Sequence, residues 1–265
     1  MVSVGRHPAS LGTGLLITDL VLLSGNAAFS LWVWRQRSAA ARSALTAGAH
    51  PGIVLGLVLI ASHATEWFGI FESRQAALIR GMGSVLLMLG LLGTAGSAAW
   101  QRTRSGSLAI TAGLWCGTVA VLILLSFAFT LNLLFERHAT VWLLEAFVAS
   151  GMSDAGAYVV RNALEAASEI LVRIPIAALV LSVSASAASA WITKWPRPVT
   201  ILAASFTPLF FVAGVACLWY LDSLARADRP PFVLAGLILT GIALCSAHPL
   251  WSSLHRARPE DRTAT

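Results

Sequence analysis

The run LAITAGLWCGTVAVLILLSFAFTLNLLF, residues 108–135, decides the fold of this chain. None of its residues carries a charge, and as a helix it is long enough to cross the roughly 30 Å of hydrocarbon in a membrane. The run therefore predicts a transmembrane helix. Six further apolar runs predict the same, at 11–34, 51–71, 81–100, 175–193, 199–221 and 231–251.

Composition agrees with a chain that lies mostly in lipid. Of its 265 residues, 57% are hydrophobic and only 11% are charged, whereas soluble domains carry about 25% charged residues. No long polar segment interrupts the apolar runs, so we expect a single all-α domain over residues 1–265. Most tryptophans, Trp67 among them, lie at or near the ends of runs, as interfacial aromatic belts do. The sequence predicts a polytopic bundle of about seven transmembrane helices.

The basic residues indicate the orientation of the bundle. The net charge is +6, but the basic side chains are scattered at the ends of apolar runs, which argues against a nucleic-acid partner. Four basic clusters fall on one side of the predicted spans, with ten basic residues and only two acids, and the positive-inside rule makes that side cytoplasmic. We expect the N-terminus outside, the C-terminus inside, and the lipid bilayer of a bacterial plasma membrane as the surroundings. The bacterial origin rests on the preference for arginine and alanine.

The one long connection, residues 136–174, is predicted to lie on the external face. Its first part, ERHATVWLLEAFVAS, suits a helix in the membrane interface, and Ser153 or Asp154 is expected to cap the next helix. Pro175 suits the first turn of the following span. The connection should form an external amphipathic helical hairpin. Charges recur along one stripe of its second helix at every fourth residue, and these are the candidates for binding a partner: Arg161, Glu165, Glu169 and Arg173.

A few ionisable residues lie within or at the ends of the predicted spans, where charge is costly. Asp19 and His63 fall at comparable depth and are expected to face each other. Glu66 and Asp222 lie near the same predicted boundary. Such a pair either fixes helix register or forms a site that moves protons or binds a cation. The spacing His63-x-x-Glu66 is a poor metal signature, and the three cysteines lack zinc spacing, so no metal or cofactor is expected.

Three classes of function fit these features. The first is an integral membrane subunit or scaffold that docks a protein partner through the external hairpin. The second is an intramembrane enzyme whose candidate catalytic residues act on a lipid-soluble substrate, and the third is a transporter of ions or small solutes. Transporters need polar groups on both sides of the midplane, and here the ionisable groups gather near the outer face. The scaffold function requires the fewest assumptions.

Overall fold

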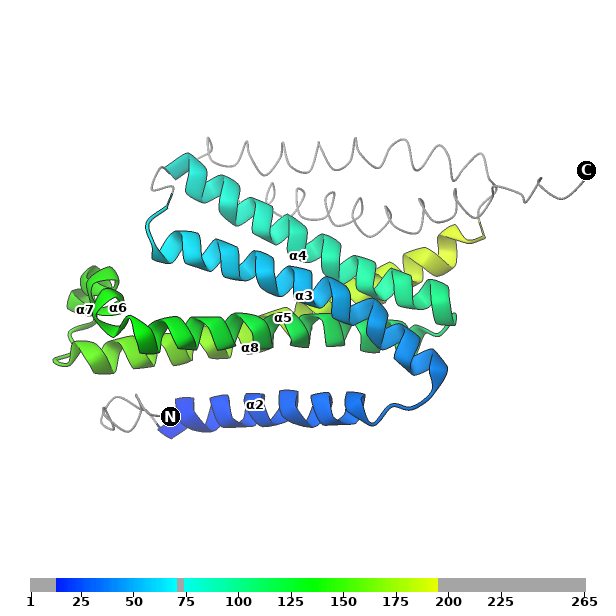
Figure 1. Ribbon diagram of the computed structural model, residues 1–265, viewed down its shortest axis with the longest axis horizontal. Coiled ribbons are helices and arrows are strands. Elements are labelled where there is room, and N and C mark those ends of the chain that lie inside the picture. Colours follow the sequence, from blue (N-terminus) through cyan, green and yellow to red (C-terminus); the bar gives the residue numbers. More distant parts are fainter. Residues whose placement is uncertain (1–12, 71–73, 195–265) are drawn as a thin grey trace, which may run out of the picture. The chain divides into compact units, whose positions relative to one another are not determined.

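The computed structural model describes residues 13–70 and 74–194, and within these ranges the chain is helical apart from short connections (Figure 1). The long helices are α2 (Thr13–Trp34), α3 (Ala39–Trp67), α4 (Arg74–Thr103), α5 (Gly106–Leu134) and α8 (Ala155–Ile192). Two short helices, α6 (Glu136–Trp142) and α7 (Leu144–Ser150), lie between α5 and α8. The all-α prediction is confirmed for this part of the chain.

All five long helices are long and apolar enough to cross a membrane. They coincide with the first five predicted spans, apart from their ends. The predicted spans at 199–221 and 231–251, together with Asp222, lie outside the described residues. A helical membrane bundle is therefore the fold of the described part.

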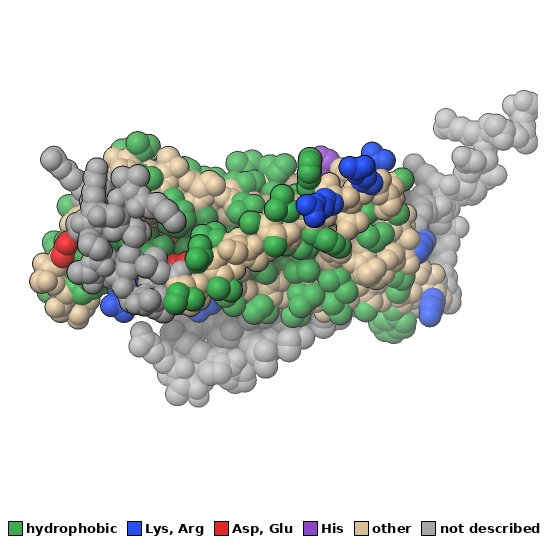
Figure 2. Space-filling model, turned by 90° about the horizontal axis from the view of Figure 1, so that it is seen from below, with side chains coloured by type: hydrophobic (Ala, Val, Ile, Leu, Met, Phe, Trp, Pro, Cys, Tyr) green, Lys and Arg blue, Asp and Glu red, His purple; other side chains and the backbone are tan. Residues whose placement is uncertain are grey.

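Apolar side chains cover much of the described surface in view in Figure 2. On α2, Leu20 is 62% exposed and Val21 is 63% exposed, and on α5 Leu134 is 71% exposed. Contiguous apolar surface of this kind is rare on soluble monomers and marks contact with lipid or protein. The lengths of the helices and their exposed apolar surfaces thus both indicate a membrane.

Two predicted helix starts are wrong, and both are at prolines. Pro175 does not begin a new helix but lies inside α8, which runs unbroken for 38 residues, or about 57 Å at 1.5 Å per residue. Pro51 likewise lies inside α3, which begins at Ala39 rather than at the proline. Proline removes one helical hydrogen bond, but a full break in an apolar setting leaves more backbone groups unpaired. Both helices therefore continue through their prolines.

The described chain divides into two compact units, which we treat separately. The first contains residues 13–37, 52–70, 74–84 and 117–176, and the second contains 38–51, 85–116 and 177–194.

In the second unit, small residues allow helices to approach closely. A Cβ atom at Gly113 would lie 1.5 Å from Ser182 Oγ, and one at Gly96 would lie 2.9 Å from Ser182 Cα. A Cβ at Gly48 would lie 2.1 Å from the carbonyl oxygen of Ala112. These contacts pack α4, α5 and α8 within the chain, as small residues do at helix interfaces in membranes. The core of this unit is correspondingly alanine-rich: Ala44, Ala47, Ala99, Ala109 and Ala112.

In the first unit, the core is built around a tryptophan. Trp67 at the end of α3 packs with Leu131 of α5, Ala139 of α6 and Val159 of α8. Lower on the same helix, Gly56 leaves room for Ile123, whose Cβ would lie 2.9 Å from an added methyl group. This unit contains all of α2 and all the described candidate residues.

Candidate functional sites

Asp19 is buried, as predicted, but its partner is not His63. The side chain is 5% exposed, and Oδ1 accepts a hydrogen bond from the Ser168 hydroxyl on α8. Its other oxygen, Oδ2, is buried and has no hydrogen-bond partner within the described part of the chain. The expected pairing of Asp19 with His63 is therefore wrong. Asp19 instead ties α2 to α8.

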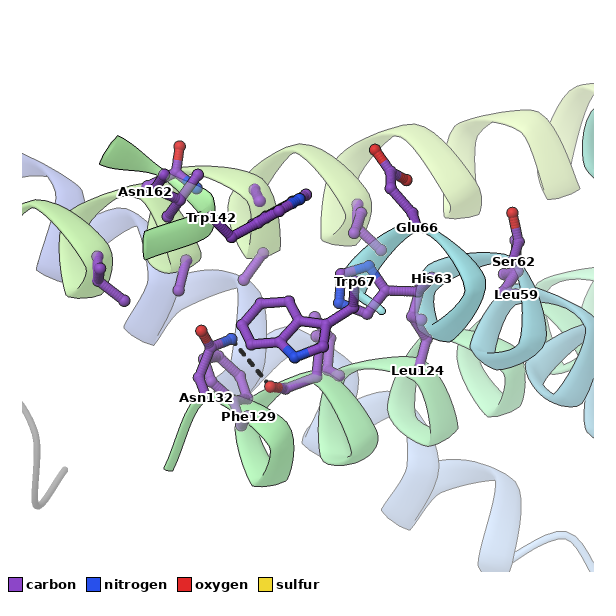
Figure 3. A pocket seen from close by; sticks show the side chains of 18 residues that line it. Leu59, Ser62, His63, Glu66, Trp67, Leu124, Phe129, Asn132, Trp142 and Asn162 are labelled. Atoms are coloured by element: carbon purple, nitrogen blue, oxygen red, sulfur yellow. Dashed lines mark hydrogen bonds between the residues drawn. The ribbon is translucent and has the colours of Figure 1, made fainter. Parts of the chain in front are cut away.

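His63 lies near the end of α3, with its ring centroid 6.0 Å from that of Trp67. Its Nε2 atom is buried and has no hydrogen-bond partner among the described residues. Glu66, predicted to point into the bundle, is exposed, although it lines the edge of the same cavity as His63. In Figure 3 the carboxylate of Glu66 and the indole of Trp67 point in different directions.

Trp67 is only 2% exposed and sits among aromatic rings. Its ring centroid lies 5.6 Å from that of His138 and 5.3 Å from that of Trp142. The backbone carbonyl of Trp67 accepts a hydrogen bond of 2.9 Å from His138 Nε2. The contacts fix the first turn of α6 against the end of α3. The indole Nε1, however, is buried without a hydrogen-bond partner in the described structure.

These side chains line a cavity of about 310 Å³ within the first unit (Figure 3). Helix α3 contributes His63, Glu66 and Trp67, and most of the other lining side chains are apolar. Two asparagines also reach it. The amide nitrogen of Asn132 donates to the carbonyl oxygen of Ala128 at 2.9 Å, and Asn162 comes from α8. The cavity thus combines an apolar wall with a small set of polar groups, which is the usual composition of a ligand site.

The unpartnered nitrogens at this cavity need a physical account. A buried donor left without an acceptor costs about 1–3 kcal/mol, and native structures contain few such groups. Trp67 Nε1 and His63 Nε2 are two of them, and both residues line the same cavity. The sequence analysis assigned Trp67 only to an interfacial aromatic belt. Its position four residues after His63 puts both side chains on the same helix face, and this spacing is the sequence feature that indicates a shared site.

The charged stripe of α8 forms two ion pairs within the helix. Arg161 Nε lies 2.8 Å from Glu165 Oε1, and Arg173 Nη1 lies 3.3 Å from Glu169 Oε2. All four side chains are at least half exposed, from 50% for Glu165 to 76% for Arg173. Ion pairs this exposed to solvent contribute little to the stability of a helix.

The stripe lies at the same level as an apolar part of α5. Side chains of α8 between residues 159 and 170 and of α5 between residues 124 and 132 line one cavity, so the two segments run at the same level of the first unit. Next to this segment α5 exposes apolar side chains, with Leu122 39% and Leu133 57% exposed. The two exposed ion pairs of α8 therefore stand at the level of a helix that exposes apolar surface.

The connection between α5 and α8 contains the two short helices. Val141 on α6 and Val148 on α7 are 71% and 70% exposed. Gly151 ends α7 with a φ of 70°, and Asp154 Oδ1 accepts a hydrogen bond of 3.1 Å from the Ala157 amide. Asp154 is thus the N-cap of α8, one of the two residues predicted for that role. Phe147 and Tyr158 pack with ring centroids 5.9 Å apart.

Within residues 13–70 and 74–194, no three histidine, cysteine, aspartate or glutamate side chains gather as a metal site would require. Comparison with protein families, with curated proteins and with solved structures finds no match for this chain. Function must therefore be inferred from the two sites above.

Proposed function

We propose that this chain is an integral membrane subunit that docks a different protein through the exposed charged stripe of α8, formed by Arg161, Glu165, Glu169 and Arg173. The observation that carries the proposal is that two fully formed ion pairs stand exposed on α8, at the same level of the first unit as an apolar stretch of α5. Exposed ion pairs contribute little to stability by themselves. A protein surface with complementary charges gives the four side chains further partners.

The order of the charges favours a partner other than a second copy. Two copies in one bilayer with the same orientation, related by a two-fold axis along the membrane normal, bring their α8 helices together in parallel. Each residue of the stripe then meets its own equivalent, so arginine faces arginine and glutamate faces glutamate. Like charges placed opposite each other are unfavourable. A partner with acids opposite Arg161 and Arg173, and bases opposite Glu165 and Glu169, avoids this.

In this proposal the chain lies in a bacterial plasma membrane with its N-terminus outside and its C-terminus inside. The basic clusters at Arg35, Arg37 and Arg42 and at Arg102 and Arg104 support that orientation. The connection over residues 136–174 then lies on the external face, where the partner approaches. Its exposed Val141 and Val148, on either side of Glu145, suit short helices that lie in the membrane interface.

A charge swap tests the docking stripe without removing its ion pairs. The variant Arg161→Glu, Glu165→Arg, Glu169→Arg, Arg173→Glu keeps opposite charges at each i, i+4 spacing, so α8 should fold as before. It inverts the pattern that the partner meets. We expect the parent chain, extracted mildly from its native membrane, to migrate as a complex larger than its own 28.0 kDa. The swapped variant should migrate as the chain alone.

The matched control is Glu145→Arg, which reverses an exposed acid on α7 outside the stripe and should leave the complex intact. If the swapped variant retains the same complex as the parent chain, the stripe does not dock a partner. A parent complex that contains only copies of this chain would likewise contradict the proposal.

A further inference from the structure

The cavity between α3, α5 and α8 in the first unit is independent of the charged stripe and has a chemistry of its own. Its volume is about 310 Å³, at the lower end of ligand pockets. Leu59, Leu124 and Phe129 contribute to its apolar wall. We propose that it binds a neutral, lipid-soluble molecule whose carbonyl oxygen accepts a hydrogen bond from Trp67 Nε1.

The indole nitrogen determines whether the ligand group donates or accepts the hydrogen bond. Trp67 is 2% exposed, and its Nε1 has no acceptor within the described chain. An indole N–H can only donate, so the group that satisfies it must be an acceptor. His63 also lines the same cavity, and its unpartnered Nε2, when it carries the proton, can donate to a second acceptor on the ligand. A carbonyl compound supplies the hydrogen-bond acceptor that the indole N–H lacks.

The described lining of the cavity disfavours an anionic ligand group. Among the eighteen described residues that line it, none is lysine or arginine, and Glu66 is the only acid. Recognition of phosphate or carboxylate groups relies on arginine or lysine, which these eighteen residues do not supply. A neutral carbonyl needs no such cation.

The walls of the cavity favour an apolar body for the ligand. They come from the same helices whose outer faces carry exposed apolar side chains, such as Leu57 on α3 and Leu122 on α5. The aromatic rings of Trp67, Trp142 and Phe129 offer flat surfaces for contact. A ketone with a hydrocarbon tail satisfies both parts of the cavity.

A matched pair of ligands tests the proposal on the purified full chain. The probes are 2-tridecanone and tridecane, which share the apolar body and differ in the carbonyl group. Dissociation constants are measured for both by titration with native mass spectrometry. One hydrogen bond in such a site changes affinity roughly threefold to tenfold, so the ketone should bind the parent chain more tightly by that factor.

Two variants test whether Trp67 Nε1 is the nitrogen that causes the preference for the ketone. Trp67→Phe keeps an aromatic ring but removes the N–H, and it should bind ketone and alkane equally. Trp100→Phe is the control, because Trp100 Nε1 is also buried and unpartnered among the described residues but does not line this cavity. This control should keep the preference for the ketone.

Several results would overturn the proposal. These are equal affinity of the parent chain for both probes, a preference that survives Trp67→Phe, and tighter binding of tridecanoate than of the ketone. The infrared carbonyl stretch of 2-tridecanone bound to the parent chain gives the answer even if Trp67→Phe does not fold. A frequency below that of the ketone in alkane is expected, and an unshifted frequency contradicts the hydrogen bond to Trp67.

Discussion

At the scale of single residues, Asp19 shows what the sequence could and could not predict. Its polarity within an apolar run predicted that it faces protein, and the structure buries it to 5% exposure. Its partner, Ser168, lies 149 residues away on α8, and Ser168 is an ordinary polar residue in a helix rich in small residues. Depth along the predicted spans matched Asp19 with His63, whereas Ser168 was predicted to lie in the external connection. Only the packing of α2 against α8 distinguishes the two.

The Asp19–Ser168 contact makes a prediction about stability. Ser168→Ala removes the hydroxyl that donates to Asp19 Oδ1 and leaves both carboxylate oxygens unpartnered among the described residues. An unsatisfied buried group costs about 1–3 kcal/mol, so the free energy of unfolding should fall by that amount in a denaturation titration in detergent. Ser126→Ala is the control, because its exposed hydroxyl bonds only to its own helix. Equal effects of the two substitutions would show that the contact with Asp19 does not stabilise the bundle.

At the scale of helices, the apolar runs predicted where helices form but not where they end. The run at 108–135 matches α5, which spans Gly106–Leu134, because no charged residue or proline interrupts it. The run at 175–193 is only the second half of α8, since the helix continues through the proline at which the predicted span begins. The cost of unpaired backbone in an apolar setting outweighs one missing hydrogen bond.

The close approach of α5 to α8 at Gly113 can be tested by adding one methyl group. Gly113→Ala places a Cβ 1.5 Å from Ser182 Oγ and 2.6 Å from Ser182 Cβ, so one helix must shift. Overpacking of this kind costs about 1–3 kcal/mol, measured as the free energy of unfolding. Gly25→Ala is the matched control, because nothing lies within 4 Å of its added Cβ. Restoration of stability in Gly113→Ala, Ser182→Gly is expected, and a stable Gly113→Ala single variant would contradict the contact.

At the scale of the whole molecule, the class of the protein followed from composition, while its sites did not. An apolar chain with few charges predicts a helical membrane bundle, and five long apolar helices bear that out for the described residues. The cavity at Trp67 depends on how α3, α5 and α8 meet, and no spacing in the sequence shows that. The stripe on α8 was visible in the sequence, because every fourth residue is charged, but its position at the level of apolar α5 was not.

The central claim is that a protein surface covers the stripe in the native membrane. The direct measurement is electron paramagnetic resonance of a spin label at Val172, which is 40% exposed and adjacent to Arg173. We predict that in native membranes the label is shielded from both dissolved oxygen and a water-soluble nickel chelate, and that it becomes accessible in the purified lone chain. A label at Leu20, 62% exposed on α2, should meet oxygen in both preparations. A label at Val172 that meets the nickel chelate in native membranes, or stays shielded in the lone chain, would contradict docking of a partner.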